Sequence, residues 1–196
     1  MKTVMKKTKK ILINLLSTLI LVLISFYVYL NNSIDSVMTK ETQKNLFSKI
    51  KKTEDLPNSF YIQYEKLNPN GLSRNYTQSL ISRFTNNRKT CACEEIYANP
   101  SLFYNYTQFA PHIFFYEINE KIGAKKCLDY ELRNKVFANG IVGVTEASQR
   151  FYNKEIKDLK DDEILDLLII NENPSYYNPL RRKENLTKRR KQILSK

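Results

Sequence analysis

An uncharged run of twenty residues, from Ile11 to Leu30, constrains this chain more than any other feature. As a helix it would span about 30 Å, which is the thickness of the hydrocarbon core of a bilayer. Residues 1–10 precede the run with five lysines and no acid, and Tyr27 and Tyr29 lie at its far end, where interfacial aromatics are common. The pattern predicts a basic cytoplasmic segment at residues 1–10 and a transmembrane anchor at residues 11–30.

A cleaved signal peptide is the competing interpretation of this run. It would need a shorter apolar core and a small-residue cleavage site, whereas the first alanine of the chain is Ala92. A buried core helix is a further alternative, which the abrupt lysine flank disfavours. Because flanking lysines stay in the cytoplasm, we expect a single-pass protein of the plasma (inner) membrane whose C-terminal part lies on the extracytoplasmic, or periplasmic, side.

The part of the chain beyond the anchor is long enough for one domain with its own core, but not for a second catalytic domain. The whole chain has a net charge of +12, and without the five N-terminal lysines +7 remains on residues 31–196. Such a surplus suits an anionic partner such as a lipid pyrophosphate or acidic headgroups, although solvated surface lysines explain it as well. Outside the cytoplasm, no nucleic-acid partner is expected.

Two of the four glycines lie in the stretch 139–143, Asn-Gly-Ile-Val-Gly, and indicate a tight reversal between two helices. Before this stretch Leu128, Leu132 and Val136 recur every four residues, which predicts a helix that stops near Asn139. We expect Gly143 to allow a close approach of two backbone segments.

Two further helices are predicted after the reversal. Thr145 is the expected cap of the first, and Asp158 is the expected cap of the second. The second helix has acidic residues in its first turn, where they complement the helix dipole. Its predicted buried side carries Ile164, Leu165, Leu167 and Leu168.

The order of residues on this stretch resembles a known family. The matching positions are Asn139-Gly140, Gly143-Val144, Ala147, Phe151-Tyr152, Lys154, Asp158-Leu159, Glu163 and the closing Pro174-Ser175-x-Tyr177-Asn178-Pro179. They resemble the second half of the peptidoglycan glycosyltransferase, or transglycosylase, domain of class A penicillin-binding proteins and monofunctional transglycosylases. The resemblance implies a mainly α, lysozyme-like helical domain, here at residues 57–196, with residues 31–56 left as a stalk that contains a weak helix. No cofactor is expected.

In this family the catalytic glutamate opens a Glu-Asp-x-x-Phe-x-x-His motif, of which only the first residue is matched here, by Glu65. Glycosyl transfer from a lipid-linked donor needs a base that takes the proton of the attacking sugar hydroxyl while the pyrophosphate leaves. The resemblance therefore implies that Glu65 is this base. The alternative is an ordinary glutamate on the exposed side of the aromatic-rich segment 60–66, which is predicted as a strand or a buried helix.

A second motif resembles the family's Gly-Gly-Ser-Thr-Ile-Thr-Gln-Gln-Leu-x-Lys loop and helix. Thr77 and Gln78 stand in register, and Arg83 follows one position after the lost lysine. Hydroxyls, amides and cations near a helix start suit a pyrophosphate. These residues are therefore candidate contacts of the lipid-linked peptidoglycan precursor.

Arg88 and Lys89 resemble the family's Arg-Lys-x-x-Glu and are further candidate contacts of the substrate. The glutamate of that motif, the family's second functional carboxylate, falls on Ala92, or on Pro111 when it is counted back from the Asn-Gly reversal. Neither register supplies a carboxylate.

Three cysteines, Cys91, Cys93 and Cys127, lie in what should be an oxidising compartment. A Cys-x-Cys pair closes on itself with difficulty, so we expect Cys127 to be bridged to Cys91 or to Cys93. No metal site is expected, because zinc needs four ligands at known spacings.

Two functions from different classes follow. The first is an enzyme that polymerises lipid-linked disaccharide-pentapeptide in cell-wall assembly. The second is a non-catalytic relative that binds the lipid donor, a glycan strand or another envelope protein. The pair of carboxylates separates the two functions, and only Glu65 is present in the motifs.

Overall fold

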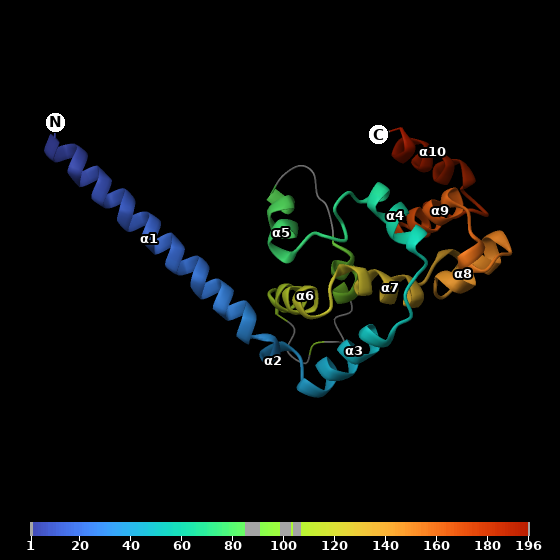
Figure 1. Ribbon diagram of the computed structural model, residues 1–196, viewed down its shortest axis with the longest axis horizontal. Helices are drawn as coiled ribbons and strands as arrows, with labels where there is room; N and C mark the ends of the chain where they lie inside the picture. The colour runs from blue at the N-terminus through green and yellow to red at the C-terminus, as the bar shows by residue number, and fades with distance from the viewer. Residues whose placement is uncertain (1, 85–90, 99–102, 104–106, 196) are drawn as a thin grey trace.

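The structure, a computed structural model, describes residues 2–84, 91–98, 103 and 107–195. Within these residues the chain is helical, with one isolated antiparallel bridge between Val136 and Val142 and no strand (Figure 1). The mainly α fold predicted from the sequence is confirmed and is consistent with a lysozyme-like transglycosylase domain. The elements are α1 (Lys2–Asn32), α2 (Ile34–Val37), α3 (Lys40–Lys52), α4 (Asn58–Leu67), α5 (Tyr76–Phe84), η1 (Ala92–Ala98), α6 (Ala110–Lys121), α7 (Ala124–Asn134), η3 (Ala138–Gly140), α8 (Val144–Tyr152), η4 (Ile156–Asp158), α9 (Asp161–Glu172) and α10 (Lys183–Leu194).

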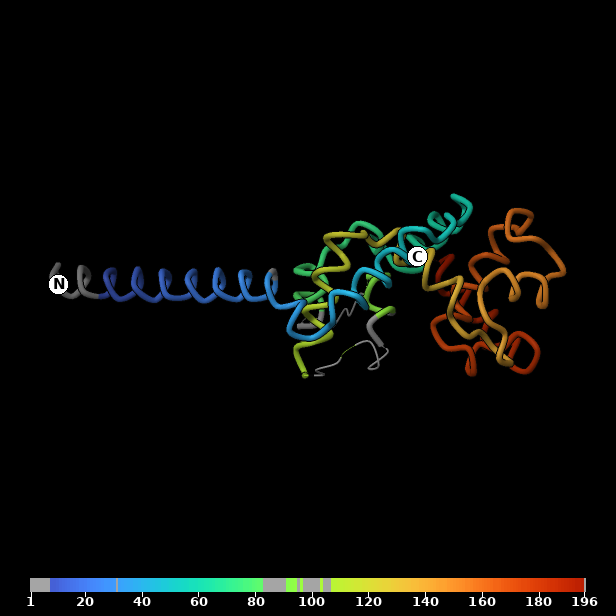
Figure 2. Tube along the Cα trace, turned by 90° about the horizontal axis from the view of Figure 1, so that it is seen from below, coloured from blue at the N-terminus to red at the C-terminus, as the bar shows by residue number. Residues whose placement is uncertain are grey.

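Helix α1 projects away from the rest of the molecule in both views (Figures 1 and 2). Its segment Thr8–Leu30 is long and apolar enough to cross a membrane, and residues 8–29 are exposed. This exposure disfavours the alternative of a core helix. At the C-terminal end of α1, the ring of Tyr27 packs edge-on against Tyr116 of α6, with ring centroids 6.0 Å apart.

The segment 31–56, predicted as a stalk, is packed into the domain. Val37 and Met38 are buried beside α6, and on α3 the spacing of Phe47 and Ile50 forms an apolar face that packs on α7. The ring of Phe47 lies 6.3 Å from that of Phe114. The sequence did not predict this face because α3 is rich in lysines, which lie on the solvent side of the amphipathic helix. The folded unit therefore begins directly after α1.

The core of the C-terminal part is a pair of helices, α4 and α9, with α10 packed on α9. Phe60, on α4, is fully buried. The predicted buried side of α9 is confirmed, since all four of its residues are buried: Ile164, Leu165, Leu167 and Leu168.

The reversal after α7 differs from the prediction in its first half. Helix α7 ends at Asn134 rather than near Asn139, and Val136 is 53% exposed although Leu128 and Leu132 are fully buried. Val136 leaves the helical stripe because the chain turns back on itself, with the amide of Phe137 donating to the carbonyl of Ile141 at 2.7 Å.

The glycines of this reversal act as predicted. Asn139 and Gly140 have φ angles of 64° and 75°, in the left-handed region. Gly143 has a φ of 82°, and a Cβ atom there would lie 2.6 Å from the carbonyl oxygen of Arg133. The close backbone approach expected at Gly143 is therefore present.

Both predicted caps of the following helices are wrong. Helix α8 starts at Val144 with Gly143 as its cap, so that Thr145 lies inside the first turn. Asp158 ends the short turn η4, and α9 starts at Asp161 after the cap residue Lys160. The carboxylate of Glu163 accepts a hydrogen bond of 2.7 Å from the amide of Lys160. This bond satisfies a backbone amide at the start of α9, the capping role predicted for Asp158.

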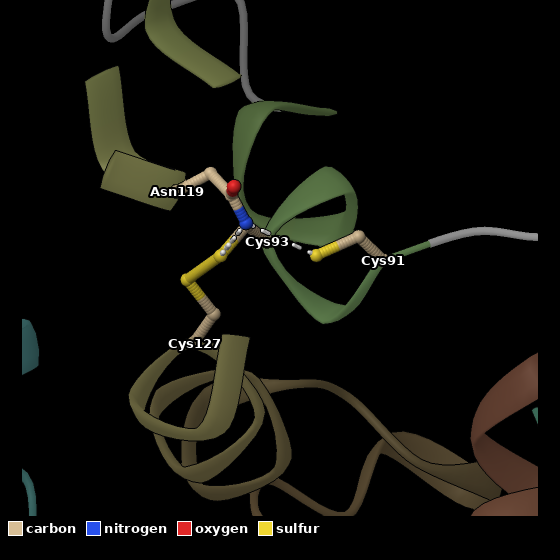
Figure 3. The surroundings of a disulfide bond; sticks show 4 residues. All are labelled: Cys91, Cys93, Asn119 and Cys127. Carbon is tan, nitrogen blue, oxygen red and sulfur yellow. Dashed lines mark hydrogen bonds between the residues drawn. A yellow bond between two sulfur atoms is a disulfide. The ribbon is translucent and has the colours of Figure 1, made fainter. Parts of the chain in front are cut away.

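A disulfide joins Cys93 of η1 to Cys127 of α7, with Cα atoms 4.9 Å apart and a sequence separation of 34 (Figure 3). This is one of the two pairings expected from the sequence. Cys91 is a buried thiol, and its burial raises its pKa to about 11. The side-chain amide of Asn119 lies 3.5 Å from the sulfur of Cys91 and 4.0 Å from that of Cys93. The bridge fixes η1 against α7 beside α6.

Candidate functional site

Glu65 lies in the last turn of α4 and is half-buried. Its Oε2 atom accepts a hydrogen bond of 2.7 Å from the amide of Asn70, and its Oε1 atom accepts one of 2.8 Å from the amide of Leu72. The carboxylate thus closes the loop that follows α4, in which Asn70 has a left-handed φ of 63°. Each oxygen keeps a second lone pair, so the group is held in place while it can still accept a proton.

A buried arginine holds the same loop from within. Arg74 is 6% exposed, and its Nη2 atom donates to the carbonyl of Pro69 at 2.7 Å. Its Nη1 atom also donates to Oδ1 of Asn68 at 3.4 Å. Arg74 stands where the resemblance places the serine of the family's Gly-Gly-Ser loop, so the motif gave it no role. Its burial beside an irregular loop has no local sequence signal.

The predicted Thr-Gln motif lies at the start of α5, where both Thr77 and Gln78 are exposed. Gln78 takes part in a reciprocal cap: its amide donates to Oδ1 of Asn75 at 2.9 Å, and the amide of Asn75 donates to Oε1 of Gln78 at 3.2 Å. The Gln78 side chain therefore stabilises the helix start in this structure.

The predicted cations are placed less completely. The backbone of Arg83 belongs to α5, whereas Arg88 and Lys89 lie outside the described residues. Glu65 and the pair Thr77–Gln78 therefore belong to consecutive helices of the chain, α4 and α5.

No carboxylate stands at either expected position of the second functional acid. Ala92 is buried in η1, and Pro111 lies in the first turn of α6. Buried acids occur nearby in the sequence: Glu94 of η1 is 6% exposed, and Glu117 of α6 forms an ion pair of 2.7 Å with Lys121. Glu94 lies two residues after Ala92, the first position at which the resemblance places the second functional acid.

The closing Tyr-Asn-Pro motif has a clear structural role. Asn178 is buried, and its Nδ2 atom donates to Oδ1 of Asn139 at 3.1 Å. Its own Oδ1 atom accepts from the amides of Leu180 and Arg181 at 2.9 and 3.2 Å. One side chain thereby ties the Asn-Gly reversal to the turn between α9 and α10, two segments that the sequence resemblance places in the same motif.

Sequence comparison relates part of this chain to known proteins. Residues 111–196 match the sequence model of the family described as transglycosylase. The chain is 31% identical over 78 residues to "Penicillin-binding protein 2a" of Streptococcus pneumoniae serotype 2 (strain D39 / NCTC 7466), a match that covers 40% of this chain and 11% of that protein. It is 28% identical over 81 residues to "Penicillin-binding protein 4" of Bacillus subtilis (strain 168), covering 41% of this chain and 13% of that protein.

The chain thus spans only a small part of the length of the curated relatives that it matches. The family match begins at Pro111, after Glu65 and the start of α5, and it includes the reversal, α8, α9 and the Asn178 turn. The segment that matches the family model and the candidate catalytic residues therefore lie on different parts of the chain. Residues 111–196 match the transglycosylase family model, and the chain is similar to two penicillin-binding proteins over about two fifths of its length, in line with the resemblance seen in the sequence.

Proposed function

We propose that this protein is a membrane-anchored peptidoglycan glycosyltransferase-like protein that acts on lipid-linked disaccharide-pentapeptide in cell-wall assembly. The observation that carries the proposal is the transglycosylase match over residues 111–196, supported by the similarity to two penicillin-binding proteins. The precursor combines a lipid, a pyrophosphate and a sugar, so a protein that uses it works at a membrane surface.

The junction between α1 and the domain supports this location. Tyr27 of α1 packs on Tyr116 of α6, and Leu30 is buried, so no flexible spacer separates the apolar helix from the folded unit. If α1 spans the bilayer, with its five N-terminal lysines in the cytoplasm, the domain lies at the surface of this membrane on the extracytoplasmic side. The pyrophosphate of a lipid-linked donor lies at that surface.

In a catalytic protein, Glu65 is the general base. Its carboxylate takes the proton of the attacking sugar hydroxyl, the new glycosidic bond forms, and the bond to the pyrophosphate breaks. The two backbone amides that hold Glu65 orient it for this role. Thr77, Gln78 and the cations of residues 83–89 are the proposed contacts of the leaving pyrophosphate.

A second function, non-catalytic binding of the lipid donor, a glycan strand or an envelope protein, is favoured by one specific observation. The polar groups of the two motifs are used for structure: Glu65 closes a loop, and Gln78 caps a helix. A relative that had lost transfer would keep its scaffold and reuse motif residues in this manner. The missing second carboxylate at Ala92 or Pro111 points in the same direction.

Purified full-length protein in detergent, supplied with lipid-linked donor and analysed by gel for glycan strands, separates the two functions. If the protein transfers glycan, Glu65→Gln should lower the rate by about 10² to 10⁴, the usual effect of losing a general base. Glu120→Gln, which changes an exposed acid of α6, is the matched control and should leave the rate unchanged.

Thermal unfolding of each variant tests whether the fold is retained, because Glu65→Gln also places an amide group against a backbone amide. Polymer from both the wild type and Glu65→Gln would refute the role of Glu65. An absence of polymer from the wild type, at a donor concentration that saturates binding, would favour the non-catalytic function.

A further inference from the structure

A polar pocket of ≈ 590 Å³ lies between the Asn-Gly reversal and the turn that leads into α10. This volume is within the range of small-ligand sites. Its lining residues come from two segments that are far apart in the sequence: Val136, Phe137, Ala138, Asn139, Gly140, Pro174, Ser175, Asn178, Arg181 and Arg182. None of them belongs to α4 or α5, so the pocket is separate from the Glu65 loop.

The charges of the lining are one-sided. Two of the ten lining residues are arginines, Arg181 and Arg182, and none is acidic. Neither guanidinium forms an ion pair with any acid that the structure describes, and Arg182 lies over the ring of Tyr176 at 6.0 Å. An adjoining groove of ≈ 500 Å³ shares both arginines and has one acid, the exposed Glu184. A pair of arginines without acidic partners favours an oxyanion, which guanidinium groups bind in a bidentate manner.

The pocket is preorganised by the buried side chain of Asn178. The Nδ2 atom of Asn178 donates a hydrogen bond to Oδ1 of Asn139. Because the oxygen of the Asn139 amide faces Asn178, the Nδ2 donor of the exposed Asn139 points away from Asn178. The Oδ1 atom of Asn178 holds the backbone of Arg181 at 3.2 Å, which fixes where that arginine leaves the turn. The hydroxyl of Ser175 lines the pocket as a further donor.

The pocket lies far from the apolar helix. Its two segments flank α8 and α9, and these helices lie at the end of the molecule opposite to α1 in both views (Figures 1 and 2). If α1 spans the bilayer, the headgroups of the lipids around this helix lie near the α1 end and not near this pocket. The anions of the precursor that extend away from the membrane are the carboxylates of its peptide.

We propose that this pocket binds the terminal carboxylate of the pentapeptide carried by the peptidoglycan precursor or the glycan strand. The proposal rests on the proposed function for the choice of ligand. Arg181 and Arg182 hold the carboxylate, and Asn139 and Ser175 donate to the adjacent peptide group. The exposed side chain of Val136 and the ring of Pro174 give an apolar wall for the small side chains of the peptide.

The four glycines of the chain allow a direct test. Full-length protein labelled with ¹⁵N-glycine in detergent gives four amide signals, of which Gly140 lines the pocket, while Gly71 and Gly123 lie elsewhere. The probe is a muramyl-pentapeptide with a free C-terminus, and the matched ligand is the same molecule with a C-terminal carboxamide. The Gly140 signal should shift with the free acid, and the carboxamide should bind at least about tenfold more weakly, because it loses the charge-assisted hydrogen bonds.

Two double variants complete the test. Arg181→Gln with Arg182→Gln should abolish the shift, whereas Lys188→Gln with Lys191→Gln removes the same charge from exposed positions of α10 and should retain it. Equal binding of the acid and the carboxamide, or an unchanged shift in the arginine variant, would overturn the proposal. Inorganic phosphate that binds more tightly than the pentapeptide would also overturn it, in favour of a phosphate ligand.

This test is independent of glycan transfer. Peptide binding is measured without lipid donor or turnover, so an inactive protein can still give the Gly140 shift. A protein that polymerises glycan and shows no shift would refute the pocket and leave the proposed function intact.

Discussion

We predict that Asp166 makes the stability of this domain dependent on pH. It lies on α9, and its Oδ2 atom accepts a hydrogen bond of 2.9 Å from Nη1 of Arg190 on α10 and one of 3.4 Å from the hydroxyl of Tyr152 on α8. Burial raises the pKa of Asp166 from 3.8 to about 6; the charge of Arg190 lowers it, while those of Asp162 and Glu163 raise it further.

The direction of the effect follows from proton binding. Between pH 4 and 6 the folded protein binds more protons at Asp166 than the unfolded chain, so the free energy of unfolding decreases as the pH rises through this window. A pKa difference of about two units corresponds to about 3 kcal/mol. The Asp166 side chain is 10% exposed, so solvent screening reduces this figure little. The stabilisation is complete below pH 4 and is lost above pH 6.

The perturbation is Asp166→Asn, which removes the titration and keeps one oxygen as an acceptor for Arg190. Urea unfolding at a series of pH values can be followed by tyrosine fluorescence, since the chain has 13 tyrosines and no tryptophan. The difference in unfolding free energy between wild type and variant should change by about 2 to 3 kcal/mol between pH 4 and 7. Asp162→Asn, at a 57% exposed side chain one turn earlier, is the control and should produce a much smaller change. If the free energies of unfolding of Asp166→Asn and of the wild type change with pH in the same way, the reasoning is refuted.

Three further predictions concern the backbone, the disulfide and the topology. Gly143→Ala should destabilise the domain by more than the roughly 1 kcal/mol expected for Gly123→Ala, because both positions have positive φ angles but only at Gly143 would the new Cβ clash with backbone; equal unfolding midpoints in urea would contradict this. Mass mapping without reduction should give a peptide that joins Cys93 to Cys127 and a free Cys91, and loss of this bridge should cost about 3 to 4 kcal/mol; three alkylatable thiols would rule the bridge out. A C-terminal reporter that is active only in the cytoplasm should be silent, and a bright signal would overturn the predicted topology.

Periodicity in the sequence was sufficient where neighbouring residues determine the structure. Leu128 and Leu132 are buried as their spacing predicts, and the Asn-Gly pair turns the chain as its residue types require. Val136 continues the same spacing but is exposed, because its bridge to Val142 depends on the path of the chain after the turn. Periodicity alone cannot distinguish the two outcomes.

Contacts between distant segments were not predictable. Asp129 is fully buried on α7, where its Oδ1 atom accepts hydrogen bonds of 2.6 Å from the hydroxyl of Tyr61 and 3.1 Å from the amide of Leu56. These contacts, together with the ion pair of Lys126 and Asp55, bind the end of the predicted stalk to α7. These contacts make residues 31–56 part of the domain. The local sequence of the segment does not indicate them.

The candidate site shows the same division. Glu65 was found from its place in a motif, whereas its hydrogen bonds to the following loop depend on how that loop folds. Arg181 and Arg182 belong to no motif in the sequence, and they lie beside the Asn-Gly reversal because Asn178 hydrogen-bonds to both segments. A pocket formed by residues 136–140 and 174–182 exists only once the chain is folded.

Binding of the lipid-linked precursor tests the central claim most directly, because glycan transfer and non-catalytic binding of the lipid donor both require it. Full-length protein in lipid nanodiscs should bind lipid-linked disaccharide-pentapeptide at least about tenfold more tightly than the same lipid pyrophosphate without sugar and peptide, because the sugar and peptide add contacts. Equal affinity for the two lipids would show that only the charged headgroup is recognised. That result would contradict the account of this protein as a peptidoglycan glycosyltransferase-like protein.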